Sequence, residues 1–149
     1  MTTEIFALCK SADSHDGRSL TVQGTIDLLR VDKLPIHIAQ LHAAYRIRFT
    51  QEDNGLRTIT FSIHKPNGDL AIEAISIQAA IRFVVPETSG TWNQVVTIQN
   101  LSIQAYGTYT AKLTIDKKQA IAQIPLFVTN QADDPTHGVL GGYIVPSAR

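Results

Sequence analysis

Apolar and polar residues alternate with a period of two in several stretches of this chain, and no other feature limits the possible folds as strongly. The stretches that alternate are 20–28, 43–50, 57–63 and 108–116. In one of them, Ile59, Phe61 and Ile63 point one way while Thr and Ser residues point the other. Ile, Thr and Val together supply 41 of the 149 residues, and branched side chains favour strands over helices. The sequence therefore predicts strands that each bury one face.

Turn-forming residues separate these stretches. Asp53-Asn54-Gly55 and Pro66-Asn67-Gly68-Asp69 each contain Asn-Gly, which tolerates the positive φ of a tight hairpin, so both are predicted to be tight turns. Asp116-Lys117-Lys118 is expected to lead into a strand over 119–129. Pro125 removes one amide donor from that strand. The strand is therefore predicted to lie at an edge, or to pair on one side only at Pro125.

The remaining segments fit a fold without long helices. Residues 92–104 are predicted to form a strand after a loop over 86–91. Residues 33–44 come nearest to a helical pattern, but the pattern is ambiguous. One interpretation is a short helical turn that leads into a strand starting near Leu41. Strands without intervening helices favour an all-β, antiparallel two-sheet sandwich of Greek-key, immunoglobulin-like or jelly-roll type, with about seven to nine strands.

Length and composition indicate one small domain. We expect residues 1–129 to form the β-sandwich domain and residues 130–149 to form a loosely attached tail, because the tail is rich in glycine and proline. Apolar residues at 139–140 and 143–145 suggest that part of the tail docks. The chain has 13 Lys and Arg against 13 Asp and Glu. A nucleic-acid partner is not expected without a basic surplus.

The same sequence favours a cytoplasmic location. Its first residues lack the basic start and apolar core of a signal peptide. No apolar run approaches the roughly 20 residues that span a bilayer, so integral membrane association is not expected. Cys9 is the only cysteine and cannot form a disulfide within the chain.

Several strand and turn segments together resemble a known family. These segments are Ala7-Leu8-Cys9, residues 19–27, residues 104–109 and residues 125–128. Over residues 4–129 the chain resembles a family of small, functionally uncharacterised bacterial β-sandwich proteins. The resemblance implies the fold and a bacterial origin, and it offers no catalytic residues. Gly107-Thr108-Tyr109 also looks like the tyrosine corner of immunoglobulin-like sandwiches, in which the tyrosine hydroxyl bonds to backbone upstream.

The loop Asp13-Ser14-His15-Asp16-Gly17-Arg18 is the densest polar segment. It can be interpreted as a cation site or an acid–base pair. A calcium site needs about six to eight oxygen ligands, so other carboxylates would have to converge on it, namely Asp53, Asp69, Asp133 and Asp134. A solvated turn is favoured, because Asp, Ser and Gly are ordinary turn residues. The polar cluster over 133–138 is interpreted as a turn or linker.

Histidine, cysteine, tryptophan and arginine give weaker signals. The histidines are His15, His37, His42, His64 and His137, and no pair has the spacing of a zinc site. Cys9 shares a face with Ile5 and Ala7 and is expected to be a small buried residue rather than a nucleophile. Trp92 is expected to pack at the end of the sandwich rather than to stack on a sugar. Arg46 and Arg48 indicate a solvated sheet face with cross-strand partners.

These observations favour a non-catalytic binding or protein-interaction module, with no catalytic residue, cofactor or metal. A protein partner or a second copy would add at the edge strand near Pro125 or at the tail. Two alternatives stay open. One is a cation-dependent surface-binding module. The other is a small hydrolase or small-ligand-binding sandwich whose site would be assembled from loop residues, namely His15, Asp16, His42, His64 and Asp134.

Overall fold

A computed structural model describes residues 1–84 and 86–130 of the chain. These residues form nine strands and one short 3-10 turn, η1 (Gln51–Asp53). The strands are β1 (Thr2–Asp13), β2 (Thr21–Thr25), β3 (Leu28–Val31), β4 (Ile36–Thr50), β5 (Gly55–His64), β6 (Ile75–Ile81), β7 (Ser89–Ile103), β8 (Gly107–Ile115) and β9 (Gln119–Asn130). The predicted all-β class is confirmed. Of the predicted tail, all but Asn130 lies outside the described residues.

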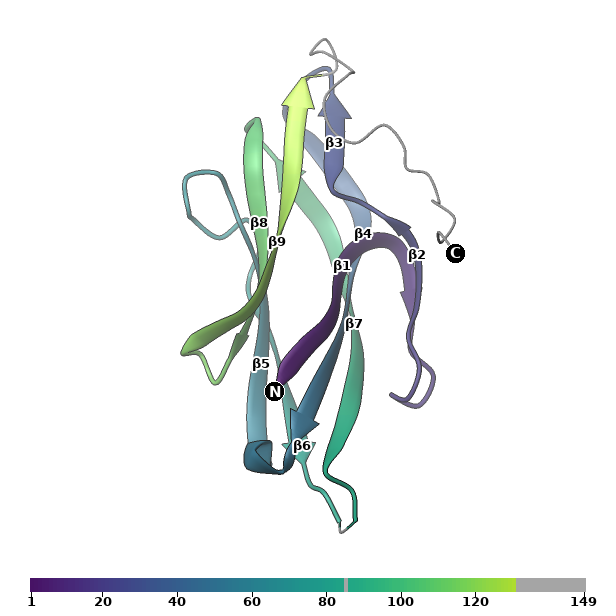
Figure 1. Cartoon of the computed structure of the whole chain (residues 1–149). Coiled ribbons are helices and arrows are strands. Elements are labelled where there is room, and N and C mark those ends of the chain that lie inside the picture. Colours follow the sequence, from purple (N-terminus) through teal and green to yellow (C-terminus); the bar gives the residue numbers. More distant parts are fainter. Residues whose placement is uncertain (85, 131–149) are drawn as a thin grey trace, which may run out of the picture.

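The strands form two sheets that pack face to face in an elongated sandwich (Figure 1). Sheet A has four strands in the order β2-β1-β4-β7, and sheet B has five in the order β3-β9-β8-β5-β6. The strand pairs are antiparallel except for β3 and β9, which run parallel. The predicted two-sheet sandwich is therefore confirmed, with one parallel pair at an edge of sheet B. Within the described residues, no helix has the length and apolar character needed to cross a bilayer.

The apolar rows predicted from the alternation form the core between the sheets. The buried members of three rows are Ala43, Tyr45, Ile47 and Phe49 on β4, Ile59, Phe61 and Ile63 on β5, and Tyr109, Ala111, Leu113 and Ile115 on β8. Strand β4 pairs with β7 along its whole length, from Ile36 opposite Ile103 to Thr50 opposite Ser89. This long pairing fixes which residues of both strands face the core, because a slip by one residue would exchange the two faces.

Trp92 of β7 closes one end of this core. Its ring centroid lies 5.8 Å from that of Tyr45, in an edge-to-face arrangement, and 6.5 Å from that of Phe49. Both geometries are typical of packed aromatic side chains. The prediction that Trp92 packs at the end of the sandwich is confirmed.

The expectation of one continuous strand over residues 20–28 is wrong. Strand β2 pairs with β1 in sheet A, whereas β3 pairs with β9 in sheet B. The chain crosses between the sheets at Ile26 and Asp27, where the Ile26 N–H bonds to β1 and the Asp27 carbonyl accepts an N–H from β9. Gly24, near the end of β2, is exposed and has a φ of +69°, a conformation that favours glycine. Alternation cannot locate such a crossing, because both halves keep the period of two.

Two expectations about the start and end of β4 are also wrong. The helical turn considered for residues 33–44 is absent, since β4 is extended from Ile36 onward. The predicted hairpin at Asp53-Asn54-Gly55 does not form, because β4 belongs to sheet A and β5 to sheet B. Gly55, with a φ of +119°, instead lies where the chain passes from one sheet to the other.

Strand β6 is missing from the predicted strands, although Ile75 and Ile77 alternate with polar residues.

The other predicted turns are confirmed. The Gly68 N–H donates to the Lys65 carbonyl at 2.9 Å, and the Lys118 N–H donates to the Ile115 carbonyl at 3.0 Å. In the second turn, Asp116 has a positive φ, as the tight hairpin between β8 and β9 requires.

Pro125 pairs on one side only, as predicted. Thr110 of β8 lies opposite Pro125, whereas β3 pairs with β9 only from Phe127 onward. The Phe127 N–H faces β3, where it donates to the Asp27 carbonyl. Because a strand repeats every two residues, the Pro125 nitrogen faces the same side, where β3 does not reach. The missing donor therefore interrupts no pairing between strands.

The predicted tyrosine-corner hydrogen bond is present. The buried hydroxyl of Tyr109, at the start of β8, donates to the carbonyl of Ala105 at 3.0 Å. Nearby, the Tyr106 hydroxyl donates to the carbonyl of Val31 at 2.9 Å. These two bonds hold the turn between β7 and β8 in shape and attach it to the end of β3.

The β1–β2 hairpin bends over the outer face of sheet A (Figure 1). The side-chain amide of Asn93, on β7, donates to the carbonyl of Gly17 in the hairpin loop at 2.9 Å. Cys9 and Ala44 lie outside the core cluster and are nevertheless 0% exposed. The predicted burial of Cys9 is confirmed, and burial raises the pKa of its thiol. A thiol with a raised pKa is less often the reactive thiolate.

Tyr45 and Tyr109 make a matched pair for testing how buried hydroxyls affect stability. The Tyr45 hydroxyl is buried and has no hydrogen-bond partner among the described residues, and burial raises its pKa. We expect Tyr45→Phe to raise the free energy of unfolding by about 1–3 kcal/mol, because an unpaired buried hydroxyl is removed. Tyr109→Phe should lower it by about 0.5–1.5 kcal/mol, because a hydrogen bond is lost.

Urea unfolding followed by circular dichroism measures both effects. A Tyr45→Phe variant that is less stable than the wild type would show that this hydroxyl has a partner in solution.

Candidate functional site

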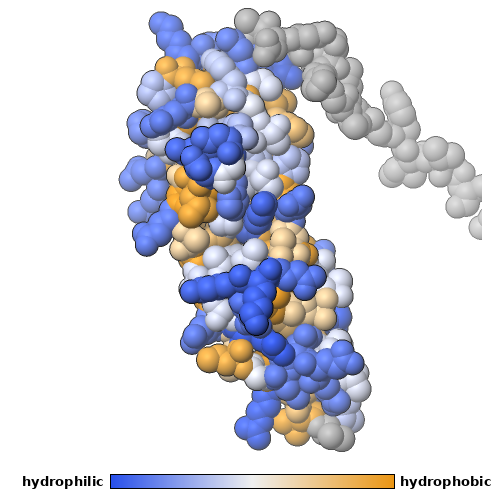
Figure 2. Space-filling model, turned by 90° about the vertical axis from the view of Figure 1, so that its left-hand side faces the viewer, coloured by the Kyte–Doolittle hydropathy of each residue, from blue (hydrophilic) through white to orange (hydrophobic). Residues whose placement is uncertain are grey.

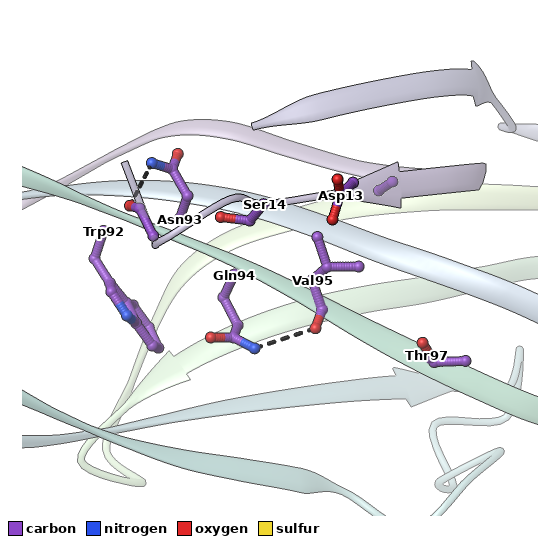
Figure 3. A pocket seen from close by; sticks show the side chains of 9 residues that line it. Asp13, Ser14, Trp92, Asn93, Gln94, Val95 and Thr97 are labelled. Atoms are coloured by element: carbon purple, nitrogen blue, oxygen red, sulfur yellow. Dashed lines mark hydrogen bonds between the residues drawn. The ribbon is translucent and has the colours of Figure 1, made fainter. Parts of the chain in front are cut away.

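A groove of about 420 Å³ lies between the β1–β2 loop and β7 (Figure 3). We call it the β7 groove, and its lining residues are Ala12, Asp13, Ser14, Gly17, Trp92, Asn93, Gln94, Val95 and Thr97. Four of them, Trp92 to Val95, are consecutive. Because successive side chains of a strand point to opposite faces, a groove that touches four in a row runs along the edge of the strand.

The exposed edge of β7 carries peptide groups that do not bond to β4. The Leu8 carbonyl accepts the Ile26 N–H and so faces away from β4. Leu8 lies opposite Ala43, and Ala43 lies opposite Val96. The alternation of peptide groups along antiparallel strands therefore turns Val96 toward β4 and Val95 toward the free edge.

Gln94 shows that one of these edge groups accepts a hydrogen bond. Its side-chain amide donates to the Val95 carbonyl at 3.1 Å (Figure 3). A side-chain amide has the same donor chemistry as a backbone N–H. The free edge of β7 is thus partly occupied by a group that resembles a peptide.

The opposite wall of the groove is held by Asn93. This side chain is 3% exposed, donates to the Gly17 carbonyl and accepts from Nη1 of Arg46 at 3.4 Å. Ser14 lies in the same wall, and its buried hydroxyl has no hydrogen-bond partner among the described residues. A fixed wall beside a strand edge gives the groove a defined width.

Asp13 is the one charged side chain among the lining residues. It pairs with Nε2 of His15 at 3.0 Å, and both side chains are largely exposed. A contact between two side chains this exposed contributes little to stability, about 0–1 kcal/mol. Because Asp13 is the one charged lining residue, the charge on the groove lining is negative.

Glu4, Arg46 and Arg48 form a separate cluster that holds β1 against β4. Nε of Arg48 donates to one oxygen of Glu4 at 2.8 Å, and Nε of Arg46 donates to the other at 3.0 Å. The hydrogen bonds from Arg48 and Arg46 lower the pKa of the Glu4 carboxyl. The prediction of cross-strand partners for the two arginines is confirmed.

Two smaller hollows carry fewer functional groups. One, of about 300 Å³, lies between β1 and β9, where Phe6, Ile26 and Pro125 line it. The other, of about 180 Å³, lies beside Phe83 and Trp92. Neither hollow has the two features of the β7 groove, which are an unpaired strand edge with a carbonyl that accepts a side-chain hydrogen bond, and a wall held by a buried side chain.

The histidines and acidic residues proposed for a loop-built site are not brought together within the described residues. His15 bonds to Asp13, and His42 bonds to the Thr97 hydroxyl at 3.2 Å. His37 and His42 are five residues apart on extended β4, roughly 16 Å at the rise of a strand. Asp133, Asp134 and His137 lie outside the described residues.

The remaining acidic candidates have local roles. Asp53 accepts the Thr50 N–H at 2.8 Å, and Asp69 accepts the side-chain amide of Asn67 at 3.2 Å. Burial opposes ionisation of Asp53, but the Thr50 N–H and the N-terminal ammonium outweigh it, so the pKa is lowered. Among the described residues, no group of three or more His, Cys, Asp or Glu side chains can hold a metal ion.

His64 takes part in a hydrogen-bond chain on the outer face of sheet B. Its Nδ1 donates to the Gly68 carbonyl at 3.1 Å, so the neutral ring accepts at Nε2 from the Ser62 hydroxyl at 3.0 Å. This is the order of groups in a nucleophile–base pair. Ser62 is only 6% exposed, however, and lines none of the three hollows. We interpret the chain as one that holds the 65–69 turn against β5.

The surface seen in Figure 2 offers no single large apolar area. Apolar residues form separate patches among polar ones on the face that the figure presents. Single exposed apolar residues are normal on a protein surface. That face therefore gives no reason to place a site there.

The sequence pattern indicated both sides of the β7 groove but not that they lie together. The loop over 13–18 stood out as polar, and residues 92–104 were predicted to form a strand. Their proximity depends on the bend of the β1–β2 hairpin, which no local pattern encodes. The Asn93–Gly17 bond joins residues that are 76 positions apart.

The family of unknown function DUF6941 matches residues 4–129 of the chain. The chain belongs to this family. The resemblance to an uncharacterised β-sandwich family is therefore confirmed. The matched residues run from β1 to the last but one residue of β9, so the DUF6941 region contains the core and both walls of the β7 groove. No curated protein matches the sequence.

Loss of the Asn93 side chain should release the wall of the groove. We expect Asn93→Ala to lower the free energy of unfolding by about 1–3 kcal/mol, because a buried polar pair is broken. Amide hydrogen exchange at residues 14–18 should become faster. Gln99→Ala, at an exposed position of the same strand outside the groove lining, is the control and should change neither quantity. Unchanged exchange in Asn93→Ala would contradict the anchoring role.

Glu4 should make stability depend on pH in acid. Its pKa in the folded protein lies below the ordinary value of 4.5, so its stabilising effect is present above that value. The effect is lost as the pH falls through the folded pKa. Urea midpoints measured from pH 3 to 7 should fall less steeply in Glu4→Gln than in the wild type. Glu73→Gln, at an exposed carboxylate, should keep the wild-type slope; equal slopes for all three proteins would refute the assignment.

Proposed function

We propose that this protein is a binding module that takes up an extended peptide segment along the free edge of β7. The observation that carries the proposal is the hydrogen bond from the Gln94 amide to the Val95 carbonyl at 3.1 Å. A ligand that presents backbone N–H groups would replace the Gln94 amide and continue the sheet. Addition of a strand to a sheet edge is a common mode of peptide recognition.

The dimensions of the β7 groove support a single added strand. Residues 92–97 span roughly 20 Å at the rise of a strand, enough for about six ligand residues. Neighbouring strands lie about 4.8 Å apart, so one strand occupies only the space beside β7. A folded sheet that paired with β7 would extend further, past the anchored loop over 13–17. The groove therefore favours an isolated extended segment over the edge of another domain.

The chemistry of the described residues favours binding over catalysis. Asp13 and His15 form an exposed pair, and Ser62 with His64 lies on the other sheet, outside the three hollows described above. The alternative hydrolase would need a convergent acid–base set, and the alternative cation-dependent module would need an oxygen cluster. The groove needs neither, because backbone groups supply most of the recognition.

We also propose an immunoglobulin-like arrangement and a bacterial, cytoplasmic setting. The Tyr109–Ala105 hydrogen bond, which has the form of a tyrosine corner, supports the first. A single buried, unpaired cysteine fits a reducing compartment. Residues 1–129 would act as the folded unit.

Proline substitution at the strand edge tests the proposal directly. The Val95 N–H faces the groove and not β4, so Val95→Pro removes a donor for the ligand without removing one from the sheet. An acetylated, amidated hexapeptide of alternating threonine and valine, with one central lysine, serves as the probe. We expect it to shift the amide signals of Asn93 and Thr97 in two-dimensional NMR spectra of the wild type but not of Val95→Pro.

The control is Gln99→Pro. Gln99 is exposed, lies on the same edge by alternation and is outside the groove lining. This variant should bind the peptide like the wild type. Equal binding by Val95→Pro, shifts confined to another strand edge, or no binding to the wild type would overturn the proposal. Light scattering that shows a dimer lost in Val95→Pro would mean that a second copy, not a free peptide, occupies the edge.

A further inference from the structure

We propose that the β7 groove selects peptide segments that carry a lysine or arginine, and that Asp13 is the residue that recognises this charge. The inference rests on the proposed function, because it names the ligand that the groove prefers. Asp13 is the only charged residue among those that line the groove. Figure 3 shows its side chain on the loop wall, over the part of β7 that contains Val95.

No lysine or arginine lines the groove, although Arg18 belongs to the same loop and Arg46 reaches the groove wall through its hydrogen bond to Asn93. Arg46 and Arg48 both bond to Glu4 and do not line the groove. His15 contacts Asp13, but it is 85% exposed and does not line the groove either. A cationic side chain on a bound strand would therefore meet an acidic wall without a competing arginine inside the groove.

The alternation of a strand sets where such a side chain must sit. Successive side chains of a bound segment point to opposite sides, so every second residue faces the loop wall. The wall there carries Asp13 together with the Ser14 hydroxyl, which has no hydrogen-bond partner among the residues that the structure describes. An ammonium or guanidinium group can donate to both, whereas a carboxylate would be repelled by Asp13.

The size of the preference follows from the exposure of Asp13. Its side chain is 62% exposed, and exposed ion pairs contribute only about a two- to five-fold change in affinity. We therefore expect charge to tune the affinity, while the strand edge provides most of it. The preference should disappear in 0.5 M salt, where the screening length is only a few ångströms.

Three peptides that differ at one residue test this inference. The probe is the threonine–valine hexapeptide with lysine, norleucine or glutamate at the central position, titrated by NMR at low salt and pH 8. For the wild type, the lysine peptide should bind about three times more tightly than the norleucine peptide. The glutamate peptide should bind more weakly than both.

Asp13→Asn should bind the lysine and norleucine peptides equally. The control is Asp16→Asn, which removes a carboxylate from the same loop but outside the lining; Asn tolerates the positive φ of 50° found there. It should keep the wild-type preference. Equal affinities in the wild type, or a lysine preference that survives in Asp13→Asn, would overturn the inference while leaving the proposed function standing. Failure of all three peptides to bind would overturn both.

Discussion

The register between β4 and β7 is the constraint on which the rest of this structure depends. The two strands pair over their full lengths, and each buries one side in the core. The same register decides which side chains of β4 and β7 point away from the core, so Ala44 and Asn93 must lie on the outer face of sheet A. Because Asn93 is there, it can hold the β1–β2 loop. The core and the groove are therefore two consequences of a single alignment.

Sheet A is unusual in that part of its outer face is buried as well. Cys9 and Ala44 are fully covered although they lie outside the core cluster. Small side chains at these positions allow the hairpin to come close, and Asn93 meets the polar groups of its loop. The cover stops at β7, the last strand of the sheet. The space that remains there, between an anchored loop and a strand edge, is the β7 groove.

Local patterns predicted the strands better than their arrangement. The buried rows that contain Phe61 and Leu113 could be predicted from the sequence alone, because the residues of a buried strand face repeat at every second position. Asn54-Gly55 signals a change of direction but not whether the next strand stays in the same sheet. The crossing at Ile26 was hidden because alternation continues through it. The groove could not be predicted either, because it depends on contacts between residues that are far apart in the sequence.

The edges of the two sheets are protected in different ways, and this difference points to function. An unprotected strand edge invites pairing with other chains. Where β3 does not cover β9, Pro125 permanently removes the donor. At β7, the Val95 carbonyl is covered only by the side-chain amide of Gln94, which can rotate away when a better donor arrives. A proline removes the donor permanently, whereas a glutamine side chain can move, and the proposed peptide would take its place. Among the described residues, this movable cover lies at an edge that also has an anchored wall, and the proposed strand-binding site needs both.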